Sequence, residues 1–120
     1  MEFVNYLVAA LFLFFIIMRF LPTKGVNNIS TKELKVELND KNKQYVDVRT
    51  PGEFKGNHIK GFNNIPLHQL AQKAVKELSK EKEVILICQS GMRSGQASKI
   101  LKKLGFSKVT NVKGGMNAWS

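Results

Sequence analysis

The only cysteine of the chain, Cys88, stands directly after the apolar run VILI and directly before the segment QSGMRS. One interpretation of such a cysteine is a small buried apolar side chain with no chemical role. A thiol becomes a strong nucleophile when it is ionised, and its pKa falls to roughly 3.5–7.5 at a helix N-terminus or beside a cation. The helix expected after this segment and the cation Arg93 supply both conditions, so the pattern predicts a reactive thiolate.

The six residues after the cysteine form the predicted binding loop. Gly91 lets the backbone turn tightly and approach a ligand closely. Successive backbone N–H groups in such a turn, together with the positive end of the following helix, attract an anion. We therefore expect this loop to hold the group that the cysteine attacks or carries. The expected site consists of Cys88 as the nucleophile and Gln89, Ser90, Gly91, Met92, Arg93 and Ser94 as its cradle.

The elements around the cysteine predict the fold class. Apolar runs predict strands over 44–48, 83–88 and 108–112, and helical spacing predicts helices over 30–38, 67–78 and 94–104. Strands that alternate with helices predict an α/β fold with a mostly parallel central sheet flanked by helices. Ligand sites in such sheets form at the carboxyl ends of the strands, which is where Cys88 stands.

The N-terminal 21 residues have a different composition from the rest. Between Phe3 and Leu21 only Asn5 and Arg19 interrupt an apolar stretch of 19 residues. As a helix this stretch reaches about 28 Å, close to the roughly 30 Å hydrocarbon core of a bilayer. A signal peptide would need a basic start and a small-residue cleavage site, and a core helix would need a polar stripe. We therefore expect residues 1–21 to be one transmembrane helix that contacts membrane lipid.

Charges near this segment predict its orientation. Arg19 lies near its C-terminal end, Lys24 and Lys32 follow it, and no basic side chain precedes it. Because basic loops stay on the cytoplasmic side, we expect a single-pass protein of the cell membrane with its C-terminal domain in the cytoplasm. A lone reduced thiol agrees with that compartment. The expected organisation is a linker over 22–29 and a folded domain over 30–120.

Polar residues near the first predicted strand are candidates for a supporting role. We expect Asp47 and Arg49 to fix the loop through buried hydrogen bonds and an ion pair, for instance with Glu53, rather than to take part in catalysis directly. His58 and His68 have no partners at metal-ligand spacing. No metal site is therefore expected.

Three segments, in order, resemble the single-domain rhodanese-like sulfurtransferases: DVRTPGEFKGNHIKGFNNIPL, ICQSGMRSGQAS and VKGGMNAW. The resemblance covers about residues 29–119 and implies the rhodanese-like α/β fold. It also implies that Cys88 carries a sulfane sulfur as a persulfide, cradled by the backbone of residues 89–94. The family often has Gly and Ala where this chain has Asn57 and Phe62, positions that affect packing rather than chemistry.

The resemblance implies sulfur transfer from a small anionic donor such as thiosulfate to a thiol or to cyanide, a reaction for which no metal or organic cofactor is expected. A phosphatase or arsenate reductase of the same superfamily is the first alternative, but its loop has five residues between Cys and Arg, and here only four lie between Cys88 and Arg93. A membrane-tethered binding module without turnover is the second, and such proteins typically lack the cysteine. The chain has a net charge of +10, yet no aromatic residues interleave the basic ones, so nucleic acid is not an expected partner.

Overall fold

The computed structural model describes residues 2–20 and 25–120 of the chain. Pro22 and Lys24, which entered the predicted linker and orientation, lie outside the described residues. The elements are α1 (Glu2–Phe20), β1 (Val26–Ile29), α2 (Thr31–Glu37), β2 (Gln44–Asp47), α3 (Pro51–Gly56), β3 (Asn63–Asn64), α4 (Leu67–Glu77), β4 (Val84–Ile87), α5 (Met92–Lys103), β5 (Val109–Val112) and α6 (Gly115–Ala118).

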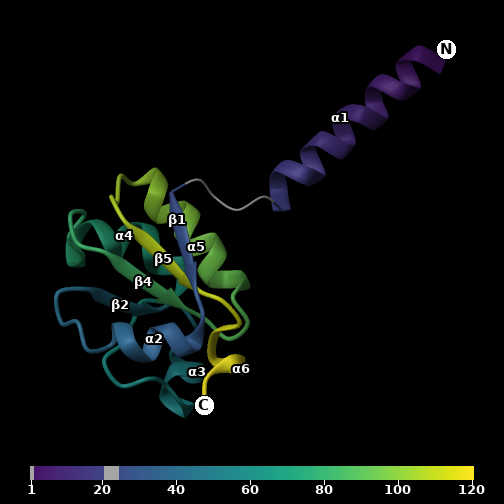
Figure 1. Cartoon of the computed structure of the whole chain (residues 1–120). Coiled ribbons are helices and arrows are strands. Elements are labelled where there is room, and N and C mark those ends of the chain that lie inside the picture. The colour runs from purple at the N-terminus through teal and green to yellow at the C-terminus, as the bar shows by residue number, and fades with distance from the viewer. Residues whose placement is uncertain (1, 21–24) are drawn as a thin grey trace.

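The strands form one sheet in the order β1-β5-β4-β2-β3 (Figure 1). All four strand pairings are parallel, which confirms the predicted α/β fold with a parallel sheet. Every residue of β4 is buried, as expected for a central strand whose two faces are both covered. The loop that follows β4 therefore starts from a fully buried strand.

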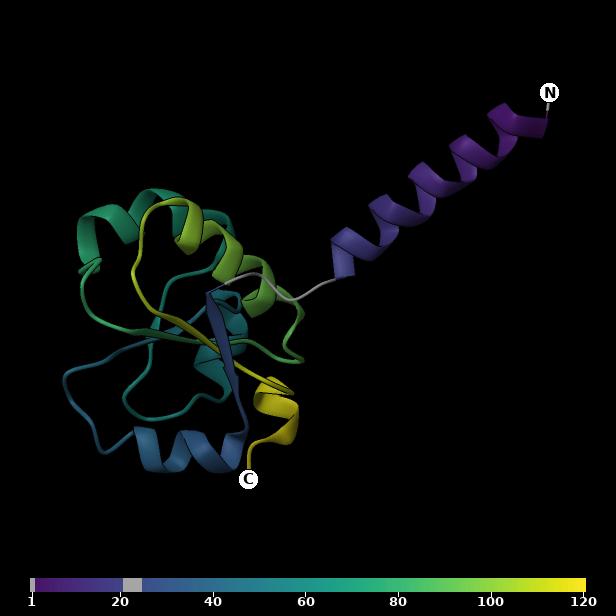
Figure 2. The same ribbon diagram turned by 45° about the horizontal axis from the view of Figure 1, so that its top comes forward.

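Helices cover both faces of the sheet, with α4 and α5 on one side and α2 and α6 on the other (Figure 2). Successive side chains of a strand point to opposite faces. Val84 and Leu86 accordingly pack in one core cluster with residues of α4 and α5. Ile85 and Ile87 pack in the second cluster with residues of α2 and α6. The domain is thus a three-layer structure with one apolar core on each face of the sheet.

Two short helices begin with the same capping arrangement. At the start of α2, Ser30 and Glu33 each accept a hydrogen bond from the backbone of the other, and at the start of α3, Thr50 and Glu53 do the same. Such a box satisfies N–H groups that have no partner within the helix. The helix α2 lies within the range 30–38 that helical spacing predicted. The equivalent Thr-x-x-Glu pattern starts α3, a helix of six residues.

Two strands were not expected from the sequence. Part of the predicted linker is β1, whose Val26–Ile29 pair in parallel with Val109–Val112 of β5. The second is the two-residue β3, which pairs with β2. Both strands contain two asparagines. Because asparagine is depleted in strands, residue propensity does not predict a strand at either place. Pairing along the sheet outweighs this local preference, and the interpretation of residues 26–29 as linker was wrong.

The N-terminal helix α1 stands apart from the sheet and its covering helices (Figure 1). Its large apolar side chains are exposed, among them Phe3, Phe12 and Phe15. A membrane span needs about 20 consecutive, predominantly apolar residues, and among the described residues no helix meets the length and apolar character needed to cross a bilayer. The transmembrane helix expected over residues 1–21 and its contact with lipid are therefore not supported. The location in the cell membrane with a cytoplasmic domain stays a prediction.

Candidate active site

Cys88 follows the last residue of β4 and lies on the same side of the sheet as Val84 and Leu86. All three side chains belong to the core cluster that α5 covers, and the exposed fraction of Cys88 is 0%. The cysteine is nevertheless not surrounded by apolar atoms alone, because the chain turns back above it to enter α5. This turn brings polar groups of residues 90–94 to its sulfur.

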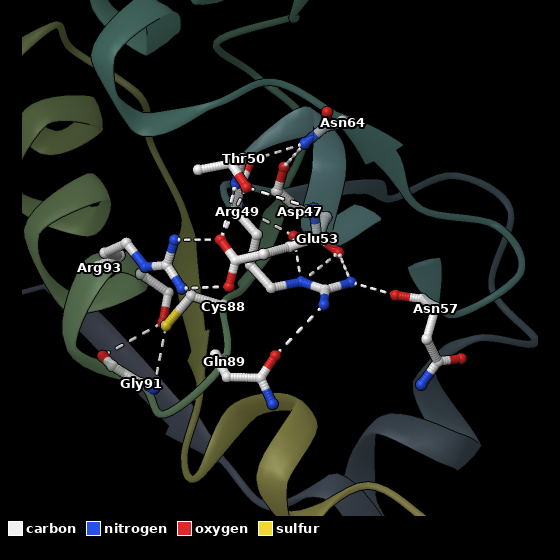
Figure 3. A network of polar contacts seen from close by, with 11 residues as sticks. Asp47, Arg49, Thr50, Glu53, Asn57, Asn64, Cys88, Gln89, Gly91 and Arg93 are labelled. Carbon is white, nitrogen blue, oxygen red and sulfur yellow. Dashed lines mark hydrogen bonds and ion pairs between the residues drawn. The ribbon is translucent and has the colours of Figure 1, made fainter. Parts of the chain in front are cut away.

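The loop supplies hydrogen bonds to the sulfur, as Figure 3 shows. The backbone N–H of Gly91 donates to the Sγ of Cys88 at 2.9 Å, and the hydroxyl of Ser94 lies 3.3 Å from the same atom. Gly91 has a φ of 102°, a left-handed conformation that other residues rarely adopt, and it precedes the first residue of α5. Glycine at this position therefore lets the loop close over the sulfur.

These contacts set the ionisation of the thiol. Burial alone would raise the pKa of Cys88, because it disfavours the charged form. Hydrogen bonds from the Ser94 side chain and from the backbone of Ser94, Gly91 and Ser90 outweigh burial and lower the pKa below its ordinary value. The arrangement therefore favours a thiolate, the nucleophilic form of cysteine.

The short helix α6 supports the loop from behind. The backbone N–H of Met116 donates to the carbonyl of Cys88 at 2.8 Å, and that of Asn117 donates to the carbonyl of Gln89 at 2.9 Å. A Cβ atom on Gly115 would collide with the Cys88 carbonyl, so this close approach requires glycine. Met116 is buried in the core, and Gly115 leaves room for the Cys88 carbonyl to reach the Met116 N–H.

Asp47 and Arg49 form a buried support beside the loop. Arg49 Nε donates to Asp47 Oδ1 at 3.0 Å and Arg49 Nη2 donates to Asp47 Oδ2 at 2.8 Å, and the two side chains are 0% and 3% exposed. Arg49 also donates to the Gln89 side chain at 3.3 Å and to the Asn57 carbonyl. These contacts include the buried hydrogen bonds and the ion pair that were expected, and the supporting role itself stays a prediction. The expected ion pair with Glu53 is wrong, because Asp47 is the partner of Arg49.

Glu53 instead binds Arg93 of the loop. Arg93 Nη1 donates to Glu53 Oε1 at 2.7 Å and Nη2 donates to Oε2 at 2.9 Å (Figure 3). Hydrogen bonding with Arg93 lowers the pKa of Glu53 to about 2, and the same contact raises the pKa of Arg93. The sequence predicted Arg93 as a cation with its charge available to a ligand. The structure gives that cation a carboxylate partner, which the capping pattern around Thr50 alone did not reveal.

The remaining predicted loop residues take different places. Ser90 and Met92 are exposed, with Met92 at 76%, while Ser94 is fully buried beneath them. The backbone of Ser90, rather than its side chain, supports the sulfur. The loop therefore presents peptide groups and the Ser94 hydroxyl toward the sulfur, and the Ser90 and Met92 side chains outward.

The side-chain contacts of the two histidines are with Phe54 for His58 and with Gln69 for His68. His58 stacks on Phe54, with ring centroids 3.9 Å apart, and its Nδ1 lies 2.8 Å from the carbonyl of that residue. Within residues 2–20 and 25–120, no group of three His, Cys, Asp or Glu side chains is arranged to hold a metal ion.

Comparison with known proteins identifies the family. The model of the rhodanese-like domain matches residues 30–120. The chain belongs to the rhodanese-like sulfurtransferase family. A sulfurtransferase of Allochromatium vinosum is 34% identical over 96 residues, which cover 79% of this chain and 89% of the relative. The thiosulfate sulfurtransferase PspE of Escherichia coli is 31% identical over 71 residues, covering 58% of this chain and 68% of PspE.

Two further relatives are matched over part of their length, and a solved structure is similar in fold. The Bacillus subtilis protein YqhL is 47% identical over 76 residues, which are 63% of this chain and 60% of YqhL. The putative sulfur carrier protein YrkF of the same organism is matched over only 52% of its length. A crystal structure of a rhodanese-like domain protein from Staphylococcus aureus superposes with a TM-score of 0.71 at 33% identity, covering 78% of this chain and 91% of that chain.

Proposed function

We propose that the chain is an enzyme that transfers a sulfane sulfur from a donor such as thiosulfate to a thiophilic acceptor through a persulfide on Cys88. The observation that carries the proposal is the sulfur held at the carboxyl end of β4 by the Gly91 N–H and the Ser94 hydroxyl. The name of PspE, a thiosulfate sulfurtransferase, supports thiosulfate as a donor.

The first half-reaction loads the cysteine. The thiolate of Cys88 attacks the outer sulfur of thiosulfate, a new S–S bond forms, and the old S–S bond breaks. Sulfite leaves with the bonding electron pair, and no proton is required. The negative charge moves to the terminal sulfur of the persulfide, where backbone N–H groups of the loop can stabilise it.

The second half-reaction unloads it. A nucleophilic acceptor such as cyanide, or a thiolate, attacks the terminal sulfur and the S–S bond to Cys88 breaks. Cyanide becomes thiocyanate and the Cys88 thiolate returns, so the cycle needs no external oxidant or reductant. Because the exposed fraction of Cys88 is 0%, both reagents have to move part of the loop aside to reach the sulfur.

A thiosulfate and cyanide assay on the full chain tests the proposal. We expect thiocyanate from the parent protein and none from Cys88→Ser, since serine cannot carry a sulfane sulfur. Mass spectrometry of the parent after thiosulfate alone should find one added sulfur atom on Cys88. Hydrolysis of an aryl phosphate without thiocyanate formation would favour the phosphatase alternative, and no turnover of either substrate would favour a binding module.

A further inference from the structure

The loop lies in a basic chain but has no excess positive charge of its own. The chain carries a net charge of +10. Around Cys88, however, Arg49 is paired with Asp47 and Arg93 is paired with Glu53. Each guanidinium therefore meets one carboxylate, and the four side chains sum to zero. An anionic donor that reaches the sulfur finds peptide dipoles but no unmatched arginine.

The pair of Arg93 with Glu53 uses one N–H donor on each terminal nitrogen of the guanidinium, and it matches the positive charge that would attract an oxyanion. A guanidinium binds carboxylates and other oxyanions through two parallel N–H groups. Both terminal nitrogens of Arg93 are already engaged by the two oxygens of Glu53, at 2.7 and 2.9 Å. Figure 3 shows the guanidinium turned toward Glu53 beside Cys88. Both side chains are 34% exposed, so the pair lies where solutes can meet it.

Glu53 is fixed in this position by the start of α3. Its Oε1 accepts hydrogen bonds from the Thr50 backbone at 3.1 Å and from the Thr50 hydroxyl at 2.9 Å. Swinging the carboxylate away from Arg93 would therefore uncap the helix. The pKa of Glu53, lowered to about 2 by the hydrogen bonds with Arg93, keeps the carboxylate charged at neutral pH. The negative partner is thus built into the site permanently.

We propose that Glu53 is a specificity-determining residue that disfavours dianionic sulfur donors: by holding Arg93 in a forked ion pair, it removes the positive charge that a small dianion would use. The donor class that the site favours is then a sulfane sulfur compound of lower charge, such as a monoanionic thiosulfonate. This inference rests on the proposed sulfur transfer through Cys88. Thiosulfate remains a donor, but Glu53 lowers its kcat/KM relative to that of a monoanionic donor. We call this selection against dianions the charge filter.

Two donors that differ by one charge test the filter in turnover. Thiosulfate carries two negative charges and releases sulfite, whereas methanethiosulfonate carries one and releases methanesulfinate with the same S–S cleavage. In Glu53→Gln the amide oxygen still accepts hydrogen bonds from Thr50, because Gln serves in a capping box as Glu does. We expect the ratio of kcat/KM for thiosulfate to kcat/KM for methanethiosulfonate to rise about three- to fivefold, the effect of one partly exposed charge pair.

The chain supplies a matched control in its other capping box. Glu33→Gln removes the same charge from the same kind of helix start, where the carboxylate accepts hydrogen bonds from Ser30. The donor ratio of this variant should equal that of the parent. In Glu53→Gln with Arg93→Gln, the gain should disappear, because the guanidinium released by the first change is gone. At about 1 M salt, where screening acts within roughly 3 Å, the gain should shrink.

A second measurement does not depend on turnover. Iodoacetate and iodoacetamide alkylate the same single thiol, but only the first carries a negative charge. Mass spectrometry follows the alkylation of Cys88 by each reagent. The rate with iodoacetate divided by the rate with iodoacetamide should rise about three- to fivefold in Glu53→Gln and stay unchanged in Glu33→Gln. A raised alkylation ratio without thiocyanate from any variant would refute the proposed function and leave the charge filter standing. Parent-like ratios in Glu53→Gln would overturn the filter, whatever the turnover.

Discussion

Two arginine–carboxylate pairs flank the cysteine, and they differ mainly in burial. The pair of Arg49 with Asp47 is 3% and 0% exposed, whereas in the pair of Arg93 with Glu53 each side chain is 34% exposed. Both are forked, with N–O distances between 2.7 and 3.1 Å. Two ion pairs with the same forked geometry can therefore have different roles when one is buried and the other is partly exposed.

The buried pair acts on structure. Arg49 reaches the Gln89 side chain of the loop and the Asn57 carbonyl at the end of α3, in addition to Asp47 at the end of β2. The pair of Arg93 with Glu53, the outer pair, joins only two elements, α3 and the start of α5. Water competes for both of its side chains because they are partly exposed. We therefore expect the buried pair to dominate stability and the outer pair to act on charge and ligand choice.

Replacing one arginine at a time should separate these roles. Arg49→Met leaves the carboxylate of Asp47 buried without its partner, which typically costs about 3–5 kcal/mol. Arg93→Met, the matched change at the outer pair, should cost about 1 kcal/mol or less. Urea unfolding of the two full-length variants, followed by circular dichroism, measures both losses. A small domain has about 5–15 kcal/mol in total, so Arg49→Met is expected to be unfolded or nearly so at low urea.

Equal losses in the two variants would contradict the assignment of roles. Asp47→Asn combined with Arg49→Met removes both charges and should recover part of the loss, because no buried charge is left unpaired. Recovery would show that the uncompensated carboxylate, rather than a missing contact with the loop, causes the destabilisation.

Most of the fold was predictable because its central elements have strong local signals. The apolar run of β4, the helical spacing of α4 and the capping box of α2 each agree with the structure. The two strands with paired asparagines, β1 and β3, had no such signal. Their pairing depends on neighbours that are distant in the sequence, β5 for one and β2 for the other, and local propensity cannot report it.

In the site, too, local features were predictable from the sequence, whereas contacts between distant residues were not. The position of Cys88 and the inward peptide groups of its loop follow from a buried strand and a glycine turn, which are local features. The choice of partners among Asp47, Arg49, Glu53 and Arg93 does not, because Glu53 and Arg93 are 40 residues apart and meet only in the folded chain. Sequence reasoning therefore found the charged residues correctly and paired them wrongly.

Because Arg49 and Arg93 are each paired with a carboxylate, we expect the thiolate to depend mainly on uncharged hydrogen-bond donors. Among side chains, the Ser94 hydroxyl lies 3.3 Å from the sulfur. Ser94→Ala removes a hydrogen bond that lowers the pKa of Cys88. We expect the pKa to rise, because the remaining backbone hydrogen bonds then oppose burial without the Ser94 hydroxyl. The pH dependence of Cys88 alkylation by iodoacetamide measures the midpoint. A midpoint that moves in Arg93→Met but not in Ser94→Ala would mean that the guanidinium stabilises the thiolate after all.

Ser98 offers the control for this change. Its hydroxyl is also buried, one helical turn further along α5, and donates to the Ser94 carbonyl at 2.8 Å rather than to the sulfur. Ser98→Ala removes the same atom from the same helix. Its alkylation midpoint should match that of the parent, and a similar rise in both variants would point to a general loosening of α5.

The smallest expected effect is the pH dependence that the outer pair gives to stability. The pKa of Glu53 in the folded chain is about 2, below the ordinary value of 4.5, because Arg93 donates to its charged form. A lowered folded-state pKa means that the contribution to stability is complete above about pH 4.5 and is lost as the pH falls toward 2. The parent should thus exceed Glu53→Gln in free energy of unfolding by less than about 1 kcal/mol at pH 7. This difference should vanish near pH 2 in urea unfolding, with Glu33→Gln as the reference for a capping box that has no arginine partner. A constant difference at both pH values would assign the effect to the cap of α3, and the outer pair would then differ from the buried one in contributing nothing to stability.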